Sequence, residues 1–296
     1  MPRISNQNFV SYGSPLLRFC ILIAFSLAIW FGPLFSSFAL AYRDSEYTHL
    51  LLIIPVSLTL IFLDWRTPAE RSRLTLSLGT ILMVLTLAVA VALRLGVVHL
   101  HPDERLSLNM LALVLWWIGA FVFSFGFSAF ERAAFPLGFL FWLVPIPQVL
   151  LDPIVRLLQE GSAVSADVIF AIAGVPVVRE GTIITIPGLA IEVARECSSI
   201  RSSLMLVVTT MVLAQMLLRS PWRKALVIAV AIPLSIVKNG LRIFVLGMLG
   251  TRVDPSYLTG RLHHQGGIIY FLIALGAIFL CLWIARRGDE KLLVSP

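Results

Sequence analysis

The sequence predicts an all-α integral membrane protein with about eight transmembrane helices, a small extracytoplasmic cap that contains strands, and both termini in the cytoplasm. The first observation is composition: 58% of the 296 residues are hydrophobic and only 13% are charged. The mean hydropathy is +0.93. A soluble domain of this length needs more polar surface than such a chain supplies. Apolar runs and the distribution of cations are the second and third observations.

The apolar runs are long enough to be transmembrane helices, which need roughly 17–25 residues to cross the hydrocarbon core. The fifth run contains Pro136, Pro145 and Pro147, which a spanning helix tolerates only where its neighbours satisfy the freed carbonyls. The eight predicted spans lie near 16–40, 47–63, 74–98, 106–127, 133–150, 198–218, 224–249 and 264–285.

The cations follow the positive-inside rule rather than the pattern of a nucleic-acid-binding protein. The net charge is +7. If both termini are cytoplasmic, twelve of the 23 Lys and Arg residues fall in short inside segments and seven fall outside. This excess of inside cations is typical of membrane proteins. We therefore expect no nucleic-acid partner and contact with membrane lipids.

Residues 151–196 differ in character from the rest of the chain. Apolar residues recur at helical spacing over 154–173 and are interrupted by polar ones, which favours an amphipathic helix at the membrane interface. The stretch 177–193 is rich in β-branched residues and has turn signals at Glu180-Gly181 and Pro187-Gly188, so it predicts two or three short strands. Unpaired strand edges cannot face lipid. We therefore place this segment outside the membrane, as a cap that leads to Cys197.

Cys197 is the candidate nucleophile, because it lies where the cap joins the sixth predicted span. A helix N-terminus favours an anion and lowers the pKa of a thiol. Arg201 lies four residues on, on the same helical face, where its charge favours the thiolate further. The other two cysteines lie inside apolar runs, and three cysteines do not make a disulfide framework.

Two further spans bring polar residues to the same membrane face. Arg242 lies in the outer third of the seventh span, where an arginine indicates function by default. His263 opens the eighth span, and His264 points about 100° away from it. Residue chemistry alone leaves open a transporter or channel lined by Arg242 and Lys238, and a non-catalytic membrane docking partner. The sequence shows no inverted repeat of the kind that many transporters contain, which argues against the transporter.

A metal centre is not expected. His99 and His101 share the second outer loop with two carboxylates, but their spacing matches no recognised set of ligands. We read them as an ordinary polar loop, and we expect no cofactor.

Three short blocks in order resemble the exosortase/archaeosortase family of integral membrane cysteine transpeptidases. They are Cys197-Ser-Ser-Ile-Arg201, Asn239-Gly-Leu-Arg242 and His263-His-Gln-Gly-Gly267, and the resemblance covers about residues 135–285. Ser199 replaces the glycine that the family pattern has after Cys-Ser, which indicates a divergent subgroup.

The resemblance implies a function in protein sorting, at the extracytoplasmic side of the cytoplasmic (inner) membrane. It implies a peptidase or transpeptidase that cleaves substrate proteins carrying a C-terminal signal of motif, transmembrane helix and basic tail. Cys197 would form a thioester, with Arg242 and His263 (alternatively His264) as catalytic partners. Arg201, Arg195 and Asn239 would bind substrate. On this reading, 1–130 is a four-span scaffold, and 131–296 is the catalytic half, with spans five to eight and the segment 151–196.

Overall fold

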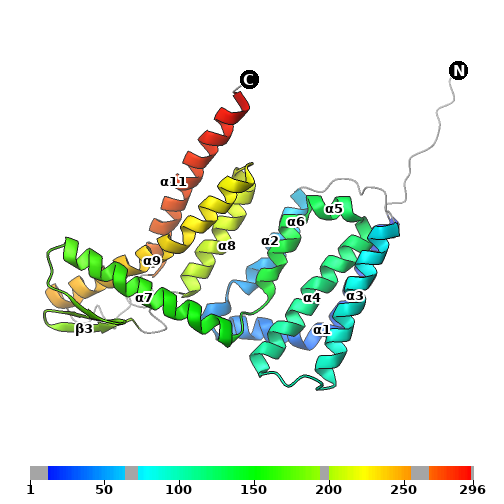
Figure 1. The fold of residues 1–296 in the computed structure, drawn as a ribbon, viewed down its shortest axis with the longest axis horizontal. Helices are drawn as coiled ribbons and strands as arrows, with labels where there is room; N and C mark the ends of the chain where they lie inside the picture. The colour runs from blue at the N-terminus through cyan, green and yellow to red at the C-terminus, as the bar shows by residue number, and fades with distance from the viewer. Residues whose placement is uncertain (1–12, 64–72, 194–199, 255–266, 295–296) are drawn as a thin grey trace. The chain divides into compact units, whose positions relative to one another are not determined.

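A computed structural model of the chain describes residues 13–63, 73–193, 200–254 and 267–294. The chain forms two compact units, Met1–Gln148 and Val149–Pro296. The division lies at the start of a long helix, about 18 residues after the boundary between scaffold and catalytic half that the sequence suggested. In Figure 1 the ribbon is coloured from blue at the N-terminus to red at the C-terminus, so the first unit runs from blue to green and the second from green to red.

The first unit is a helical assembly centred on α4. Its helices are α1 (Gly13–Arg43), α2 (Leu50–Leu63), α3 (Arg73–Arg94), α4 (Pro102–Phe125), α5 (Phe127–Arg132) and α6 (Ala134–Phe139), with 3₁₀ turns η1 (Ser45–Tyr47) and η2 (Leu140–Leu143).

Helix α4 is buried because both of its neighbours pack closely on it. The Trp117 indole donates to Ser26 Oγ of α1 at 2.9 Å. On the other side, a Cβ added to Gly79 of α3 would lie 2.9 Å from the Gly119 carbonyl oxygen of α4. Small residues let helix backbones approach where the hydrophobic effect does not drive association. The first unit therefore has a rigid centre.

The predicted fifth span, 133–150, is not one continuous helix. Helix α6 ends at Phe139, η2 follows it, and Val144 then has an extended backbone with φ −80° and ψ 115°. Pro145 and Pro147 explain the break, because a proline lacks the N–H and disfavours helical geometry in the residue before it. Two prolines at alternate positions therefore leave residues 144–147 outside any helix.

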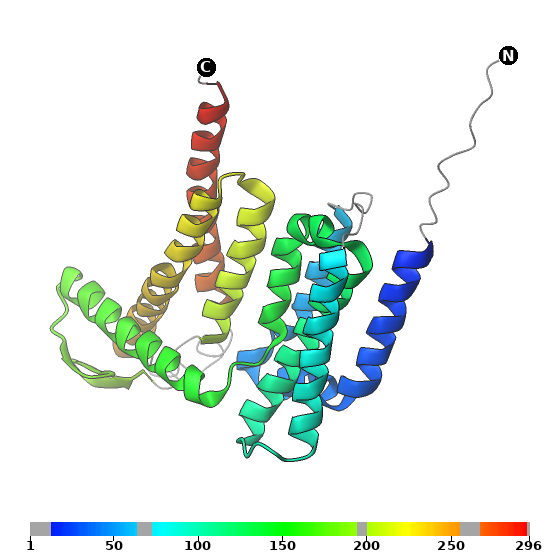
Figure 2. The same cartoon turned by 45° about the vertical axis from the view of Figure 1, so that its right-hand side comes forward.

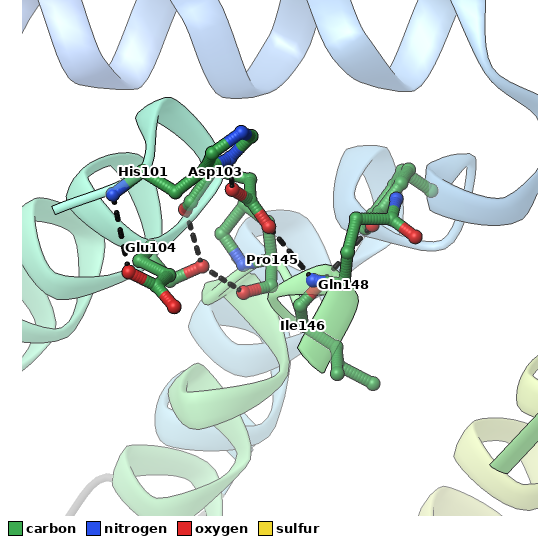
Figure 3. Close-up of polar contacts among 8 residues, drawn as sticks. His101, Asp103, Glu104, Pro145, Ile146 and Gln148 are labelled. Carbon is green, nitrogen blue, oxygen red and sulfur yellow. Dashed lines mark hydrogen bonds and ion pairs between the residues drawn. The ribbon is translucent and has the colours of Figure 1, made fainter. Parts of the chain in front are cut away.

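The backbone groups freed by this break are satisfied by side chains of the first unit (Figure 3). The segment is thus anchored where it leads into the next helix, α7. The contacts are Ser107 Oγ to the Pro145 carbonyl (2.7 Å), Tyr47 Oη to the Ile146 carbonyl (3.0 Å) and the Gln148 N–H to Asp103 Oδ2 (2.8 Å).

The second unit combines a long helix, a small sheet and a three-helix bundle. Its elements are α7 (Gln148–Ile172), β1 (Val178–Glu180), β2 (Ile183–Ile186), β3 (Leu189–Glu192), α8 (Ile200–Leu217), α9 (Pro221–Arg252) and α11 (Gly267–Val294). Figures 1 and 2 show α8, α9 and α11 side by side, with α7 and the sheet across one end of them.

That covered end contains the start of α8, the end of α9 and the start of α11 (Figures 1 and 2). The bundle is held together by apolar residues of all three helices, such as Leu206, Ala231 and Ile278, each fully buried. The alternating direction of the helices thus brings three chain segments that are distant in sequence to one end.

The predicted strands and turns are confirmed. The three strands form one antiparallel sheet in the order β1-β2-β3, with Ile184 opposite Ile191. Gly181 and Gly188 occupy the two turns with φ of +62° and +84°, a region that glycine adopts without strain. Ile184 and Ile186 face a cluster that includes Phe170 of α7 and Ile243 of α9. One face of the sheet therefore closes the core of the second unit.

Six of the described helices are long and apolar enough to cross a membrane, or up to seven if the bent pair Ala134–Leu143 and Gln148–Ile172 counts as one span. The predicted count of eight is not confirmed. Helix α2 has only 14 residues. The mostly helical, multi-pass character and the small sheet agree with the fold predicted from the sequence. The side of the membrane on which each terminus lies stays a prediction.

Candidate active site

Helix α9 carries the polar residues predicted from the seventh span. Ser220 precedes it with extended backbone and Pro221 opens it, a position where the missing N–H of proline costs nothing. The helix then runs without interruption to Arg252. Lys238 and Arg242 are four residues apart and share a face, while Asn239 lies about 100° around the helix from Lys238.

Lys238 faces α8. It is 5% exposed, and its Nζ donates to Ser202 Oγ on the first turn of that helix. An ammonium group at this depth needs such a partner because it has lost its water. The contact ties α9 to the part of α8 that follows Cys197 in the sequence.

Asn239 faces a different neighbouring helix, α7. It is 1% exposed, and its Nδ2 donates to Ser162 Oγ at 2.9 Å. Ser162 Oγ in turn donates to the Leu158 carbonyl at 2.5 Å. Adjacent residues of α9 are therefore held by two different helices, one turn before Arg242.

Arg242 is half-buried, with its Nε atom inside the protein. It lies one helical turn after Lys238 on the same face of α9. A guanidinium group carries a permanent positive charge and several N–H donors, and such donors stabilise an anion better in a low-dielectric setting than in water.

The end of β3 is held by α7 as well. Gln159 Nε2 donates to the Val193 carbonyl at 2.8 Å, and the Val193 N–H donates to the Thr182 carbonyl at 3.0 Å. Val193 is the last described residue before the segment that contains Cys197.

Four predicted site residues, Cys197, Arg195, His263 and His264, lie outside the described residues. The described elements next to them in the sequence are β3, α8, α9 and α11, and the covered end of the second unit contains the start of α8, the end of α9 and the start of α11 (Figures 1 and 2). Arg201 is described and is exposed on the first turn of α8. The meeting of all these side chains stays a prediction.

Sequence reasoning missed Gln159, Ser162 and Ser202 as partners of the site. Gln159 and Ser162 are visible in the sequence only as polar interruptions of an amphipathic helix. Ser202 is one of four serines in 198–203. Nothing local distinguishes these residues, because their partners lie 34 to 77 positions away in the chain.

In the part of the chain that the structure describes, no group of three or more His, Cys, Asp or Glu residues is arranged to hold a metal ion. His101 instead contacts Asp103 through Nδ1 at the start of α4 (Figure 3).

Helix α9 approaches α7 closely at Gly240. A Cβ added there would lie 2.4 Å from Ser165 Oγ, 2.6 Å from Ser165 Cβ and 2.9 Å from the Ala166 nitrogen. We expect Gly240→Ala to lower the free energy of unfolding by about 1–3 kcal/mol, the usual range for overpacking. Thermal unfolding in detergent would show this as a lower midpoint.

The matched control is Gly276→Ala on α11, where nothing lies within 4 Å of an added Cβ. Adding Ser165→Gly to Gly240→Ala removes two of the three close contacts and should restore part of the midpoint. If Gly240→Ala unfolds at the same temperature as Gly276→Ala, the close approach of α7 and α9 is wrong.

Comparison with protein families matches residues 41–280 to the transmembrane exosortase family. The match covers well over half of the chain and spans every candidate residue named above. Searches of the curated proteins and of the solved structures give no match. The chain thus belongs to the transmembrane exosortase family, whose members are multi-pass membrane proteins with a transpeptidase function in protein sorting.

Proposed function

We propose that this protein is a membrane-embedded cysteine transpeptidase that cleaves the C-terminal sorting signals of exported proteins through a thioester on Cys197. The observation that carries the proposal is the placement of Arg242. It lies one turn beyond a pair of buried polar residues held by α7 and α8, in the unit whose covered end receives β3, α8 and α11. The three family motifs belong to these elements or flank them.

Cys197 supplies the nucleophile. Its thiolate attacks the scissile carbonyl carbon, a C–S bond forms, and the tetrahedral intermediate collapses with loss of the C–N bond. The leaving amine takes a proton from His263, or from His264, which becomes neutral in the same step. The substrate is left as a thioester on Cys197, and its transmembrane tail is released with a new amino terminus.

Arg242 stabilises the negative charge of the tetrahedral oxyanion or of the thiolate before attack. Its half-buried position supports this role, because a fixed cation stabilises a nearby anion more strongly where the dielectric constant is low. The support of Lys238 and Asn239 on the preceding turn restricts the movement of the helix that carries it.

Transfer completes the cycle when an acceptor attacks the thioester. The neutral histidine takes a proton from the acceptor nucleophile, the new bond to the carbonyl carbon forms, and the C–S bond breaks to return the thiolate. The acceptor is a nucleophile at the outer surface of the inner membrane. This step needs no metal or organic cofactor.

Arg201 and Arg195 are proposed to bind the recognition motif of the substrate. The exposed position of Arg201 on the first turn of α8 leaves its charge available to an acidic residue of that motif. Asn239, for which the motif suggested substrate binding, is 1% exposed and bonded to Ser162. We therefore propose that Asn239 positions α9 rather than contacting substrate.

The test is to trap the thioester. Purified protein is mixed with membrane proteins of its own host, quenched in acid, and examined by mass spectrometry for an adduct on Cys197 that hydroxylamine removes. The proposal expects the adduct on the wild-type protein and on Cys20→Ser and Cys281→Ser, and none on Cys197→Ala. An adduct that persists in Cys197→Ala, or none on any variant in a preparation that still processes its substrates, contradicts it.

A further inference from the structure

The end of the three-helix bundle opposite the covered end carries an excess of cations. It contains the last residues of α8, the first residues of α9 and the C-terminal part of α11 (Figures 1 and 2). The sequence ranges 215–224 and 281–296 together hold six Lys or Arg residues and two acidic residues. No residue of the proposed active site belongs to these ranges, so the cations need a separate explanation.

Exposed tryptophans accompany these cations on two of the helices. On α11, the exposed Trp283 is followed within about one turn by the exposed Arg286 and Arg287. On α9, Trp222 is 73% exposed, and the exposed Arg219 lies just before the helix. A tryptophan beside exposed arginines is typical of the level at which a membrane protein leaves the hydrocarbon core and meets the lipid headgroups. Each of the two helices therefore indicates a membrane interface at this end.

Contacts between the helices hold two of the cations in place. Arg223 Nη1 of α9 donates to the Ala285 carbonyl of α11 at 3.2 Å. Its guanidinium group also packs on Gly288, where an added Cβ would lie 2.8 Å from Arg223 Nη2. Lys224 Nζ donates to Gln215 Oε1 of α8 at 2.8 Å. Both side chains are half-buried, so all three helices meet around two cations at one level.

The partners of Lys224 and Arg287 leave the positive charge of both side chains in place. Gln215 is neutral, and within the described residues no carboxylate forms an ion pair with Lys224. The guanidinium carbon of Arg287 lies 3.5 Å from the centre of the Trp283 ring, a cation–π contact that carries no opposite charge. A half-buried cation attracts an anion more strongly than a fully hydrated one does. The end of the bundle is therefore suited to an anion.

We propose that this end of the bundle binds the headgroup of an anionic phospholipid. The phosphate contacts Arg223 and Lys224, Arg287 lies at the edge of the site, and the acyl chains follow the exposed apolar surface of α11. Charge complementarity at a membrane interface selects this partner, because basic sites between transmembrane helices attract anionic headgroups. A zwitterionic lipid fits less well, since the same cations repel its choline group. The bound lipid links α8, α9 and α11.

The experiment measures lipid binding to the purified full-length chain by native mass spectrometry. Dioleoyl phosphatidylglycerol is compared with dioleoyl phosphatidylcholine, which has the same acyl chains and no net charge. The double variant Lys224→Gln, Arg287→Gln removes two charges from the site. Gly288→Ala keeps every charge but displaces the guanidinium group of Arg223, so it tests whether the cations act from fixed positions.

Each variant has a matched control. Arg179→Gln with Arg252→Gln removes two exposed cations from β1 and from the far end of α9, away from the proposed lipid site. Gly276→Ala adds a methyl group to α11 where nothing lies within 4 Å of it. The controls therefore separate a built site from attraction by net charge and from a general effect of altering α11.

We expect phosphatidylglycerol to bind the wild-type protein more tightly than phosphatidylcholine does. The double variant should weaken phosphatidylglycerol binding by about 10- to 30-fold, because one cation near an anionic lipid contributes about 1 kcal/mol, or about fivefold in affinity. Gly288→Ala should weaken it by about fivefold, the share of one cation. Both controls should stay within about twofold of the wild-type protein, as should Cys197→Ala.

Three results overturn the lipid site. The first is equal binding of the two lipids by the wild-type protein. The second is an equal loss in the double variant and in Arg179→Gln, Arg252→Gln, since attraction then depends on net charge alone. The third is displacement of the lipid by an equal concentration of glycerol phosphate, which would show a site for free phosphate. If the double variant does not fold, Arg287→Gln alone and Gly288→Ala decide the question.

Discussion

Replacing Cys197 by serine is expected to leave the substrates of this protein uncleaved. A serine hydroxyl is somewhat smaller than the thiol and packs similarly, but it ionises far less readily and lacks the nucleophilicity of sulfur. A site built to use a thiolate has no base matched to a hydroxyl. We therefore expect the turnover rate to fall by about 10⁴-fold or more, as removal of a nucleophile typically does.

The measurement is the ratio of full-length to processed substrate in cells that contain Cys197→Ser in place of the wild-type protein. Cys20→Ser and Cys281→Ser are the controls, because they remove a thiol elsewhere in the chain. The same experiment separates the three classes of function. A transporter that uses Lys238 and Arg242 would tolerate the serine. A docking partner would tolerate it too, but would lose function when the sheet 178–192 is deleted.

Replacing Arg242 by methionine is expected to lower the rate of thioester formation by about 10²- to 10³-fold, the effect of removing one oxyanion donor. Methionine keeps most of the length and apolar contact of the side chain while removing its charge. Arg242→Lys should recover only part of the loss, since an ammonium group cannot reproduce the planar fork of donors. Arg252→Met, at the exposed end of α9, is the matched control.

The pH dependence of the Arg242→Met variant distinguishes its two proposed roles. If the guanidinium stabilises the thiolate, its loss raises the pKa of the Cys197 thiol, and the rate recovers as the pH is raised. If it stabilises the oxyanion, the rate falls by the same factor at every pH. An Arg242→Met protein that is folded and retains the wild-type rate across this range rules out both roles.

Local sequence signals predicted much of the second unit correctly. The turns at Glu180-Gly181 and Pro187-Gly188 divide the chain into the three observed strands, because glycine supplies a positive φ that other residues adopt with strain. The family predicted from three short motifs is confirmed by the match over 41–280. The subgroup suggested by Ser199 stays a prediction.

Local sequence patterns did not predict the features that depend on residues distant in the chain. Hydropathy alone counts 133–150 as a span, but Pro145 and Pro147 break it, and the freed carbonyls are satisfied by Tyr47 and Ser107 from far along the chain. The motif suggested that Asn239 binds substrate, which stays a prediction, but it gave no sign of the bond to Ser162, which is set by how α7 crosses α9. Side-chain pairs of this kind follow from tertiary packing, which no local pattern contains.

Two glycines in the second half of α9 determine how closely α7 and the sheet approach that helix. Gly240 touches α7, and a Cβ added to Gly247, two turns on, would lie 2.9 Å from Ile191 of β3 and 3.0 Å from Phe170 of α7. Distances this short are below van der Waals contact, so an added methyl group does not fit there without movement of its neighbours. A side chain larger than glycine at position 240 or 247 would therefore push α7 or the sheet away from α9, so the absence of a side chain at these two positions sets how closely the three elements pack.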